Sequence, residues 1–303
     1  MEVQDVTFFS GGLVVRGRLH LPDSAVAPPW PTLVAPCGWM ETMCSNVSEP
    51  FHKGLAEAGF AVLAFDYRGW GASEGEPGWV RPSAQVEDVL AAVAFVEAQE
   101  NLDVNRLGMF GLGGTGGGTV IYSAAAEPRV KAIAVQSVVA DGELWMRGMR
   151  REYEWQEFRA RVASNRVRRA LTNEDELVNP TEELMVSSPE RRSVGMPVRG
   201  DQFHLSSAEE LLRFRPVDVV GRIAPRAVLV VCVDDDVVTP PEHALALYRA
   251  SGQPKRLVRQ HGITHYQAYS RNFEGLMVEF TNWYRQYLVN PALDGFGPEP
   301  ADV

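Results

Sequence analysis

The stretch that most constrains the fold is RLGMFGLGGTGGGTVIYSAAA, residues 106–126. Residues 106–111 form a short apolar run typical of a buried strand, and residues 115–126 are typical of a helix. A glycine-rich turn at 111–115 joins the two. A buried strand that passes directly into a helix is a unit of a parallel sheet covered by helices.

The same alternation of apolar strands with helices extends over most of the chain. It predicts an α/β fold with a mostly parallel twisted sheet flanked by helices. Residues 5–9 and 13–21 flank a Gly-Gly pair and predict an antiparallel hairpin. The other expected strands are 31–38, 60–66, 106–111, 130–137, 226–234 and 255–260. The expected helices are 49–59, 82–99, 115–126, 240–252 and 273–288, with Ser83 as the N-cap of the second.

Residues 142–215 break this pattern, because they are richer in charge and in large aromatic side chains and read as helices without strands. We expect them to form a helical lid inserted into a core made of residues 1–141 and 216–303. Three large side chains of this lid are the expected substrate contacts: Trp145, Met149 and Tyr153. The alternative is that the aromatic residues pack the lid onto the core.

The lid also carries a cluster of arginines, Arg147, Arg150 and Arg151. Two interpretations are open for this cluster. The arginines bind a substrate carboxylate or an acidic enolised ring, or they line a solvated helix face, which is the commoner role of such a run.

Charge and composition exclude several classes of function. The net charge of −10 argues against nucleic acid and against an anionic membrane surface, both of which need basic patches. No apolar run reaches membrane-spanning length, and the first residues lack the pattern of a signal peptide. Three cysteines, an odd number without metal-binding spacing, predict a reduced, cytoplasmic protein without a metal site.

Three positions in loops after expected strands carry the functional signal. The turn 111–115 comes first, Asp236 follows a late strand, and His265 follows the last strand. With PCGWMET at 36–42 and AFDYRGWGASEG at 64–75, they make the sequence resemble the α/β-hydrolase superfamily along nearly its whole length. It looks closest to the dienelactone-hydrolase and acetylxylan-esterase-like branch, which carries a helical lid.

This resemblance implies the chain order nucleophile, acid, base. It assigns Asp236 as the acid and His265 as the base, and it places Gly113 where the G-x-S-x-G pattern has its serine. The hydroxyl that would form an acyl-enzyme is therefore lost. The oxyanion hole needs only backbone N–H groups, and the matching positions are Gly114 and Trp39.

Other side chains near the site have less direct roles. Thr115 is expected to point away from the nucleophile position and to pack at the start of the helix. Cys37 stands where many relatives have a histidine, and it is either a thiol nucleophile or, as we expect at the end of a buried strand, a small buried apolar residue. Asp66 and Arg68 are expected to brace the loop beside the site. The remaining histidines are expected to be surface or packing residues: His20, His52, His204, His243 and His261.

The chemistry left is a histidine base, held by a carboxylate, opposite an oxyanion hole. This combination removes a proton α to a carbonyl and stabilises the enolate. We therefore expect a lyase of secondary metabolism that eliminates a small acid or cleaves a C–C bond. One alternative is a hydrolase of an ester, lactone or β-diketone that uses a His-activated water, and another is a non-catalytic binding protein. Gly113 is either native, as the run GGTGGG favours, or engineered.

The expected ligand is a small to medium apolar carbonyl compound, bound without a cofactor. A closed symmetric homodimer is the general expectation for an assembly of this protein. A dinucleotide site at GLGGTGG is disfavoured, since no acidic residue follows a second strand about 20 residues further on.

Overall fold

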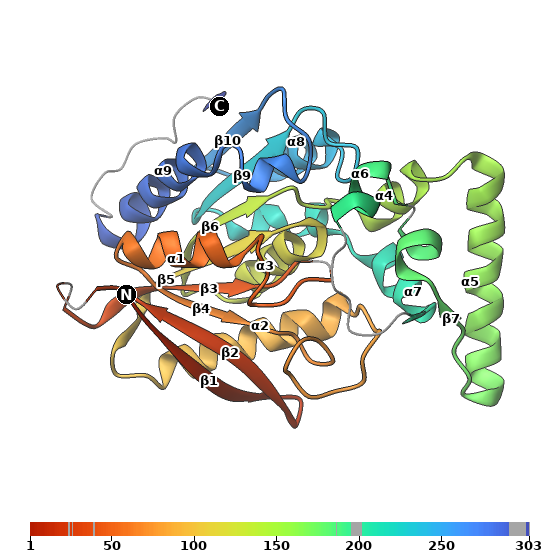
Figure 1. The fold of residues 1–303 in the computed structure, drawn as a ribbon, viewed down its shortest axis with the longest axis horizontal. Helices are drawn as coiled ribbons and strands as arrows, with labels where there is room; N and C mark the ends of the chain where they lie inside the picture. Colours follow the sequence, from red (N-terminus) through yellow and green to blue (C-terminus); the bar gives the residue numbers. More distant parts are fainter. Residues whose placement is uncertain are drawn as a thin grey trace.

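The structure is a computed structural model that describes residues 1–23, 25, 27–38, 40–185, 187–194, 202–290 and 301–302. Most of its strands form one large sheet (Figure 1). These strands are β1 (Glu2–Ser10), β2 (Leu13–Leu21), β3 (Trp30–Pro36), β4 (Ala61–Phe65), β5 (Leu102–Leu112), β6 (Val130–Gln136), β9 (Ala227–Val233), β10 (Lys255–Gln260) and β11 (Ala301–Asp302). Their order is β1-β2-β4-β3-β5-β6-β9-β10-β11. β2 pairs antiparallel with β1 and β4, and the other pairings in this sheet are parallel.

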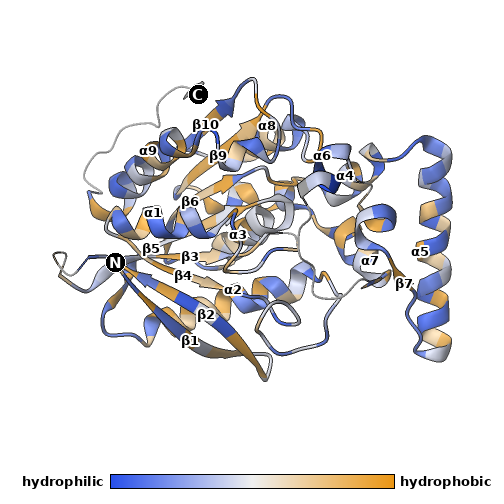
Figure 2. Ribbon diagram, in the orientation of Figure 1, coloured by the Kyte–Doolittle hydropathy of each residue, from blue (hydrophilic) through white to orange (hydrophobic). Residues whose placement is uncertain are grey.

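Helices cover both faces of the sheet, which confirms the α/β architecture expected from the sequence. One face carries α1 (Glu49–Glu57) and α9 (Phe273–Tyr284), which continues into η5 (Arg285–Val289). The other face carries α2 (Pro82–Glu97), α3 (Gly114–Ala126) and α8 (Pro241–Ala250). Short helical turns connect these elements: η2 (Pro216–Asp218), η3 (Val220–Ile223) and η4 (Gln267–Tyr269). The middle strands are mostly apolar because both of their faces are covered (Figure 2).

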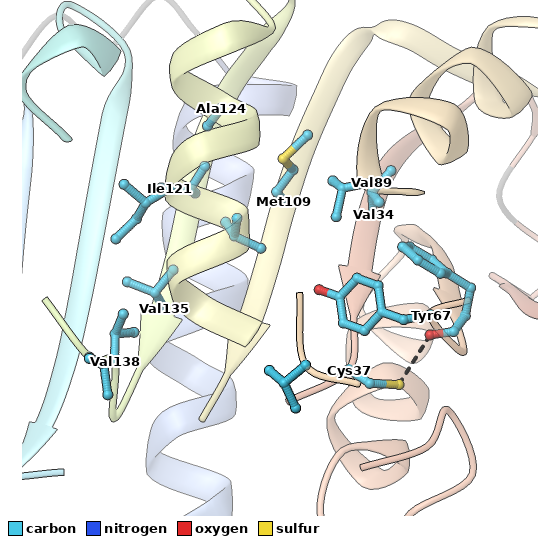
Figure 3. Packing of buried hydrophobic residues seen from close by; sticks show 14 of the residues in the cluster. Val34, Cys37, Tyr67, Val89, Met109, Ile121, Ala124, Val135 and Val138 are labelled. Atoms are coloured by element: carbon cyan, nitrogen blue, oxygen red, sulfur yellow. Dashed lines mark hydrogen bonds between the residues drawn. The ribbon is translucent and has the colours of Figure 1, made fainter. Parts of the chain in front are cut away.

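The position of α3 depends on its glycines. A Cβ on Gly116 would lie 2.7 Å from the carbonyl oxygen of Cys37, so any larger residue would push α3 away from the loop after β3. Ile121 of α3 lies in one apolar cluster with Val135 and Val138 at the end of β6 (Figure 3). The glycine run therefore lets α3 begin close against the sheet, which fixes the turn at 111–115.

Residues 142–215 pack at one end of the sheet (Figure 1). They contain α4 (Gly142–Gly148), α5 (Glu152–Thr172), η1 (Pro180–Leu184), α6 (Pro189–Val194) and α7 (Ser206–Arg213). The expectation of helices without strands is wrong in one detail, because β7 (Leu177–Val178) pairs antiparallel with β8 (Phe203–His204). Strands of two residues are too short to show an alternating pattern. α5 is mostly hydrophilic (Figure 2), and no helix in the described ranges is long and apolar enough to span a membrane.

The start of α2 also differs from expectation. Arg81 is the N-cap, and Pro82 occupies the first helical position, where its missing N–H has no helical partner to lose. The hydroxyl of Ser83 instead donates to Glu210 of α7 at 3.0 Å. Ser83 therefore connects α2 to residues 142–215 and does not cap the helix.

Candidate active site

The loops that follow β5, β9 and β10 meet beyond the carboxyl ends of these parallel strands. A pocket lies there, and the core lines it with Gly113 after β5, Thr239 after β9 and His265 after β10. Residues 142–215 add three lining side chains: Trp145, Met185 and Arg191. Ligands of open α/β sheets bind at this edge.

His265 and Asp236 form a buried pair beside this pocket. Nδ1 of His265 lies 2.7 Å from Oδ2 of Asp236, and the two residues are 6% and 4% exposed. Oδ1 of Asp236 accepts hydrogen bonds from the N–H groups of Val238 at 2.8 Å and Thr239 at 2.7 Å. An ionised carboxylate only accepts hydrogen bonds, so the proton of the imidazole is assigned to Nδ1, which donates to Asp236 and leaves Nε2 as a base.

Aromatic rings hold the imidazole from the side. The ring of Tyr266 meets His265 edge-on with centroids 4.8 Å apart, and that of Tyr269 does so at 5.5 Å. In the described part of the chain, no serine, threonine or cysteine side chain is hydrogen-bonded to His265. The pair therefore lacks the nucleophile that completes a catalytic triad.

Gly113 occupies the turn between β5 and α3. Its backbone angles are φ 73° and ψ 170°, a region that is essentially restricted to glycine. Its N–H donates to the carbonyl of Gln136, and its carbonyl accepts the N–H of Gly117 as the first helical bond. The N–H groups of Gly114 and Thr115 have no acceptor among the described residues, so they are available to an oxygen in the pocket.

Of the two residues expected to form the oxyanion hole, only one lies in the described part of the chain. Gly114 is the first residue of α3 and lines the pocket, as that role requires. Trp39 lies outside the described residues. The role of both stays a prediction.

Thr115 lies next to the nucleophile position, in the first turn of α3, and it is one of the residues that line the pocket. Its side chain is 1% exposed, which agrees with the expected packing at the start of this helix. Its Oγ1 is buried and has no hydrogen-bond partner among the described residues. The direction expected for this side chain, away from the nucleophile position, stays a prediction.

Cys37 lies in the apolar core and is not among the residues that line the pocket. Its Sγ donates to the carbonyl of Phe65 at 3.1 Å, and its side chain is 1% exposed (Figure 3). Burial, with the nearby Asp66 carboxylate, raises the pKa of the Cys37 thiol well above its usual range. These features favour the small buried residue over the thiol nucleophile.

Asp66 and Arg68 hold the neighbouring loops together. The Asp66 carboxylate accepts the N–H groups of Met43 at 2.7 Å and Ala72 at 2.8 Å. Arg68 donates to the buried carboxylate of Asp88 at 2.8 Å. This geometry agrees with a bracing role for both residues.

Glu41 is a pocket residue that the sequence did not point to. Its carboxylate accepts hydrogen bonds from the hydroxyls of Ser45 at 2.8 Å and Ser48 at 3.0 Å, and from the N–H of Gly38 at 3.1 Å. Burial raises the pKa of Glu41, since desolvation outweighs these bonds. The Gly38 N–H is therefore occupied and does not serve the substrate. The only signal in the sequence was the PCGWMET segment itself.

Of the three residues expected to contact the substrate, one lines the pocket and two do not. Trp145 lines the pocket, and its Nε1 donates to the carbonyl of Val238 at 2.8 Å. Met149 is partly buried against the core and does not line the pocket. Tyr153 is 57% exposed on α5, and its hydroxyl donates to Glu154. Tyr153 lies in the first turn of α5, which runs along the outer side of the molecule, away from the sheet (Figure 1).

The arginine cluster of the sequence also lies away from the pocket. Arg147 pairs with Glu152 at 2.9 Å. Arg150 donates to backbone carbonyls and lies over the ring of Phe158. Arg191 and Met185 line the pocket instead. Arg191 lies in a short helix and Met185 directly after one, and helices this short show no periodicity that could mark these residues in a sequence.

The remaining histidines contact backbone, carboxylates or each other and do not line the pocket. The backbone N–H of Ala140 donates to Nδ1 of His243 at 3.3 Å, and His204 and His261 lie against carboxylates. His20 and His52 pack together in the core, with ring centroids 5.8 Å apart. Across the described ranges, no group of three or more histidine, cysteine or acidic side chains is placed to hold a metal ion.

The architecture and the edge that holds the pocket define an α/β-hydrolase fold. The chain resembles the solved α/β hydrolase GrgF from Penicillium sp. sh18 with a TM-score of 0.81 and 21% identity, covering 95% of this chain and 99% of that one. The family within this class is given by the sequence. Residues 11–267 match the model of the X-Pro dipeptidyl-peptidase (S15) family, and the chain belongs to this family.

Several relatives match over most of their length, among them the following two proteins. An uncharacterized 31.7 kDa protein in the traX-finO intergenic region of Escherichia coli is 32% identical over 252 residues, which is 80% of this chain and 87% of the relative. Thiohydrolase aneE of Aspergillus aculeatus is 26% identical over 292 residues, 88% of this chain and 87% of the relative. The superfamily resemblance predicted from the sequence is thereby confirmed.

Proposed function

We propose that this protein is an enzyme of secondary metabolism that uses His265 as a general base on a carbonyl compound. Residues 142–215 serve as the lid of its pocket. The observation that carries the proposal is the pairing of His265 with Asp236 beside Gly113, a position without a side chain. A complete His–Asp pair next to such a position keeps proton transfer and loses acyl transfer.

The favoured reaction is elimination of a carboxylic acid from a β-acyloxy carbonyl compound. Nε2 of His265 takes the proton from the carbon α to the carbonyl, and the C–H electron pair forms an enolate. The enolate oxygen accepts hydrogen bonds from the N–H groups of Gly114 and Thr115. The enolate then forms a C=C bond as the β-carboxylate leaves, and His265 returns its proton to that carboxylate.

The size of these effects shows what else the site must supply. A positioned general base contributes about 10²- to 10⁴-fold, which is roughly 3 to 5 kcal/mol. Two oxyanion donors contribute about 3 kcal/mol each. The sum of roughly 9 to 11 kcal/mol reaches only the lower part of the range of enzymatic rate enhancement. Substrate positioning by the pocket must therefore contribute as well.

A second candidate function is hydrolysis by a His265-activated water. Two observations favour it. The relative aneE is named a thiohydrolase, and Gly113 leaves room for a water where a serine side chain would otherwise lie. In that reaction Nε2 of His265 takes a proton from water, and the resulting hydroxide adds to the carbonyl carbon. A non-catalytic binding protein is the third candidate.

The test compares wild type with His265→Gln and Gly113→Ser. Proton NMR in deuterated water follows α-proton exchange and elimination on β-acyloxy carbonyl compounds, and aryl esters and thioesters report hydrolysis. We expect wild type to exchange and eliminate, and His265→Gln to lose about 10²- to 10⁴-fold. Thioester hydrolysis without α-proton exchange would transfer the assignment to the second candidate. A silent wild type together with esterase activity in Gly113→Ser would leave a disabled hydrolase and overturn both enzyme proposals.

A further inference from the structure

Arg191 is a buried cation in the pocket, and no acidic side chain pairs with it among the residues that the structure describes. Its side chain lies on α6, lines the pocket and is 8% exposed. Nη1 donates to the hydroxyl of Tyr266 at 2.8 Å, and Nη2 lies 3.5 Å from the sulfur of Met40. Nε is buried and has no hydrogen-bond partner among the described residues. Most of the five donors of this guanidinium are therefore unused.

The acidic residues nearby are engaged elsewhere. Glu190, the preceding residue, accepts the hydroxyl of Thr264. Glu41, the carboxylate that lines the same pocket, accepts two serine hydroxyls and a backbone N–H. In the described part of the chain, no carboxylate lies within ion-pair distance of Arg191. A buried charge without a counter-charge is costly, and an arginine does not escape this cost by losing its proton.

Half-buried arginines of this chain have acceptors that Arg191 lacks among the described residues. The buried Nε atoms of Arg168 and Arg256 also have no partner in this part of the chain, but each of these guanidinium groups pairs with a carboxylate. Arg150 donates to the backbone carbonyls of Met146, Glu183 and Leu184. Arg226 likewise donates to carbonyls at the end of α3. The fold thus provides acceptors for such groups away from the pocket. Because Arg191 lines the pocket, a ligand bound there would lie next to its guanidinium group.

We propose that Arg191 binds a carboxylate of the substrate, so that the substrate is a carbonyl compound that also carries an acid group. This inference rests on the proposed function, because it takes the pocket to be the substrate site. Nε and an Nη on one edge of a guanidinium match the two oxygens of a carboxylate. One positive charge balances one carboxylate, whereas a phosphate dianion would leave excess charge beside Trp145 and Met185.

Tyr266 connects this anchor to the reacting group. Its hydroxyl accepts the hydrogen bond of Arg191, and its ring packs against His265 with centroids 4.8 Å apart. A substrate carboxylate bound to Arg191 therefore lies on the His265 side of the pocket, while the substrate carbonyl oxygen lies at the N-terminus of α3. Binding of these two groups orients the α carbon of the substrate, which supplies the positioning that the proposed reaction requires.

The test measures binding independently of catalysis. The probes are 4-oxo-4-phenylbutanoate and its methyl ester, which share the ketone and differ in the negative charge. Titration calorimetry follows both probes on wild type, Arg191→Met, Arg191→Lys and Arg192→Met. Arg192 is the matched control, because it is the neighbouring residue, its side chain is 56% exposed, and it pairs with Glu182. Thermal melts confirm that each variant is folded.

We expect wild type to bind the acid about 10- to 100-fold more tightly than the ester, as a charge-assisted pair provides. Arg191→Met should lose this preference, Arg191→Lys should keep part of it, and Arg192→Met should keep all of it. Equal binding of acid and ester by wild type, or a preference that survives in Arg191→Met, would overturn the inference. If Arg191→Met does not fold, the wild-type preference and its reduction in Arg191→Lys decide the matter.

The same titrations on His265→Gln separate this inference from the proposed function. A preference for the acid in both wild type and His265→Gln, without any α-proton exchange by wild type, would support the carboxylate site while the general-base proposal fails. Exchange by wild type without a preference for the acid would leave the proposed function standing and remove Arg191 as the anchor.

Discussion

The pocket has two walls, one built by the core and one built by residues 142–215, and they differ in how their charged side chains are paired. On the core wall, Asp236 accepts one imidazole and two backbone N–H groups, so its negative charge is compensated within the fold. On the wall built by residues 142–215, Arg191 has one neutral hydroxyl, one sulfur and a buried Nε without a described partner. In the proposals made above, the core wall therefore carries the chemistry, and a ligand supplies the acceptor that Arg191 lacks among the described residues.

The largest expected effect comes from breaking the core wall at Asp236. In Asp236→Asn the amide oxygen still accepts the N–H groups of Val238 and Thr239, but its NH₂ group faces Nδ1 of His265 and donates. The imidazole then carries its proton on Nε2 and no longer acts as a base. We expect α-proton exchange to fall by about 10²- to 10⁴-fold, with little change in the melting temperature.

The control for this variant is Asp234→Asn. Asp234 lies in the same loop but pairs with Arg259 at 2.9 Å, at a partly exposed position. Its loss should leave the exchange rate within about twofold of wild type, since surface pairs contribute little. Equal losses in both variants would mean that the loop as a whole, and not the imidazole tautomer, limits the reaction.

The core wall could be predicted from the sequence far better than the inserted one. Buried strands give long apolar runs, and the acid and base each follow such a run, so Asp236 and His265 could be placed from periodicity and family resemblance. Arg191 and Met185 lie in or near short helices without a repeating pattern, and their approach to the pocket depends on tertiary packing. Tyr153 looked equivalent to Trp145 in the sequence, because residue type does not reveal which face a helix exposes.

His52 in the core is a second buried basic group, and it sharpens the contrast with Arg191. Burial lowers the pKa of His52 to about 3, so this imidazole avoids the cost of an unpaired charge by staying neutral. In the unfolded chain the imidazole of His52 binds a proton as the pH falls through about 6.5, and in the folded protein it does not. The contribution of His52 to the free energy of unfolding is therefore fully present above about pH 6.5 and is lost as the pH falls below that value.

We expect the free energy of unfolding to fall by about 2 kcal/mol between pH 7.5 and pH 5, because only the unfolded state binds the proton of His52. His52→Leu should not show this part of the decrease. Urea denaturation of wild type and His52→Leu at several pH values measures the free energy of unfolding. A decrease that is unchanged in His52→Leu would assign the acid sensitivity to other groups and weaken the comparison with Arg191.

A smaller effect on stability is expected from the hydrogen bond of Trp145, which connects the two walls of the pocket. Trp145 of α4 donates to the carbonyl of Val238, whose own N–H binds Asp236. Trp145→Phe keeps most of the apolar surface and removes this hydrogen bond, so we expect a stability loss of about 1 kcal/mol. Trp155→Phe is the matched control, because the interactions described for this buried ring are aromatic contacts. A larger loss in the control would show that packing, and not the hydrogen bond, connects the walls.

The smallest effect is expected at Tyr153, on the outer face of residues 142–215. Its side chain is 57% exposed and contacts the neighbouring Glu154 through its hydroxyl. Tyr153→Ala should therefore change stability by less than about 0.5 kcal/mol and leave exchange, elimination and acid binding at wild-type values. If this variant weakens binding of the acid probe as Arg191→Met does, then α5 moves onto the pocket when a ligand binds. In that case recognition would be shared along the insertion and would not be concentrated at its buried arginine.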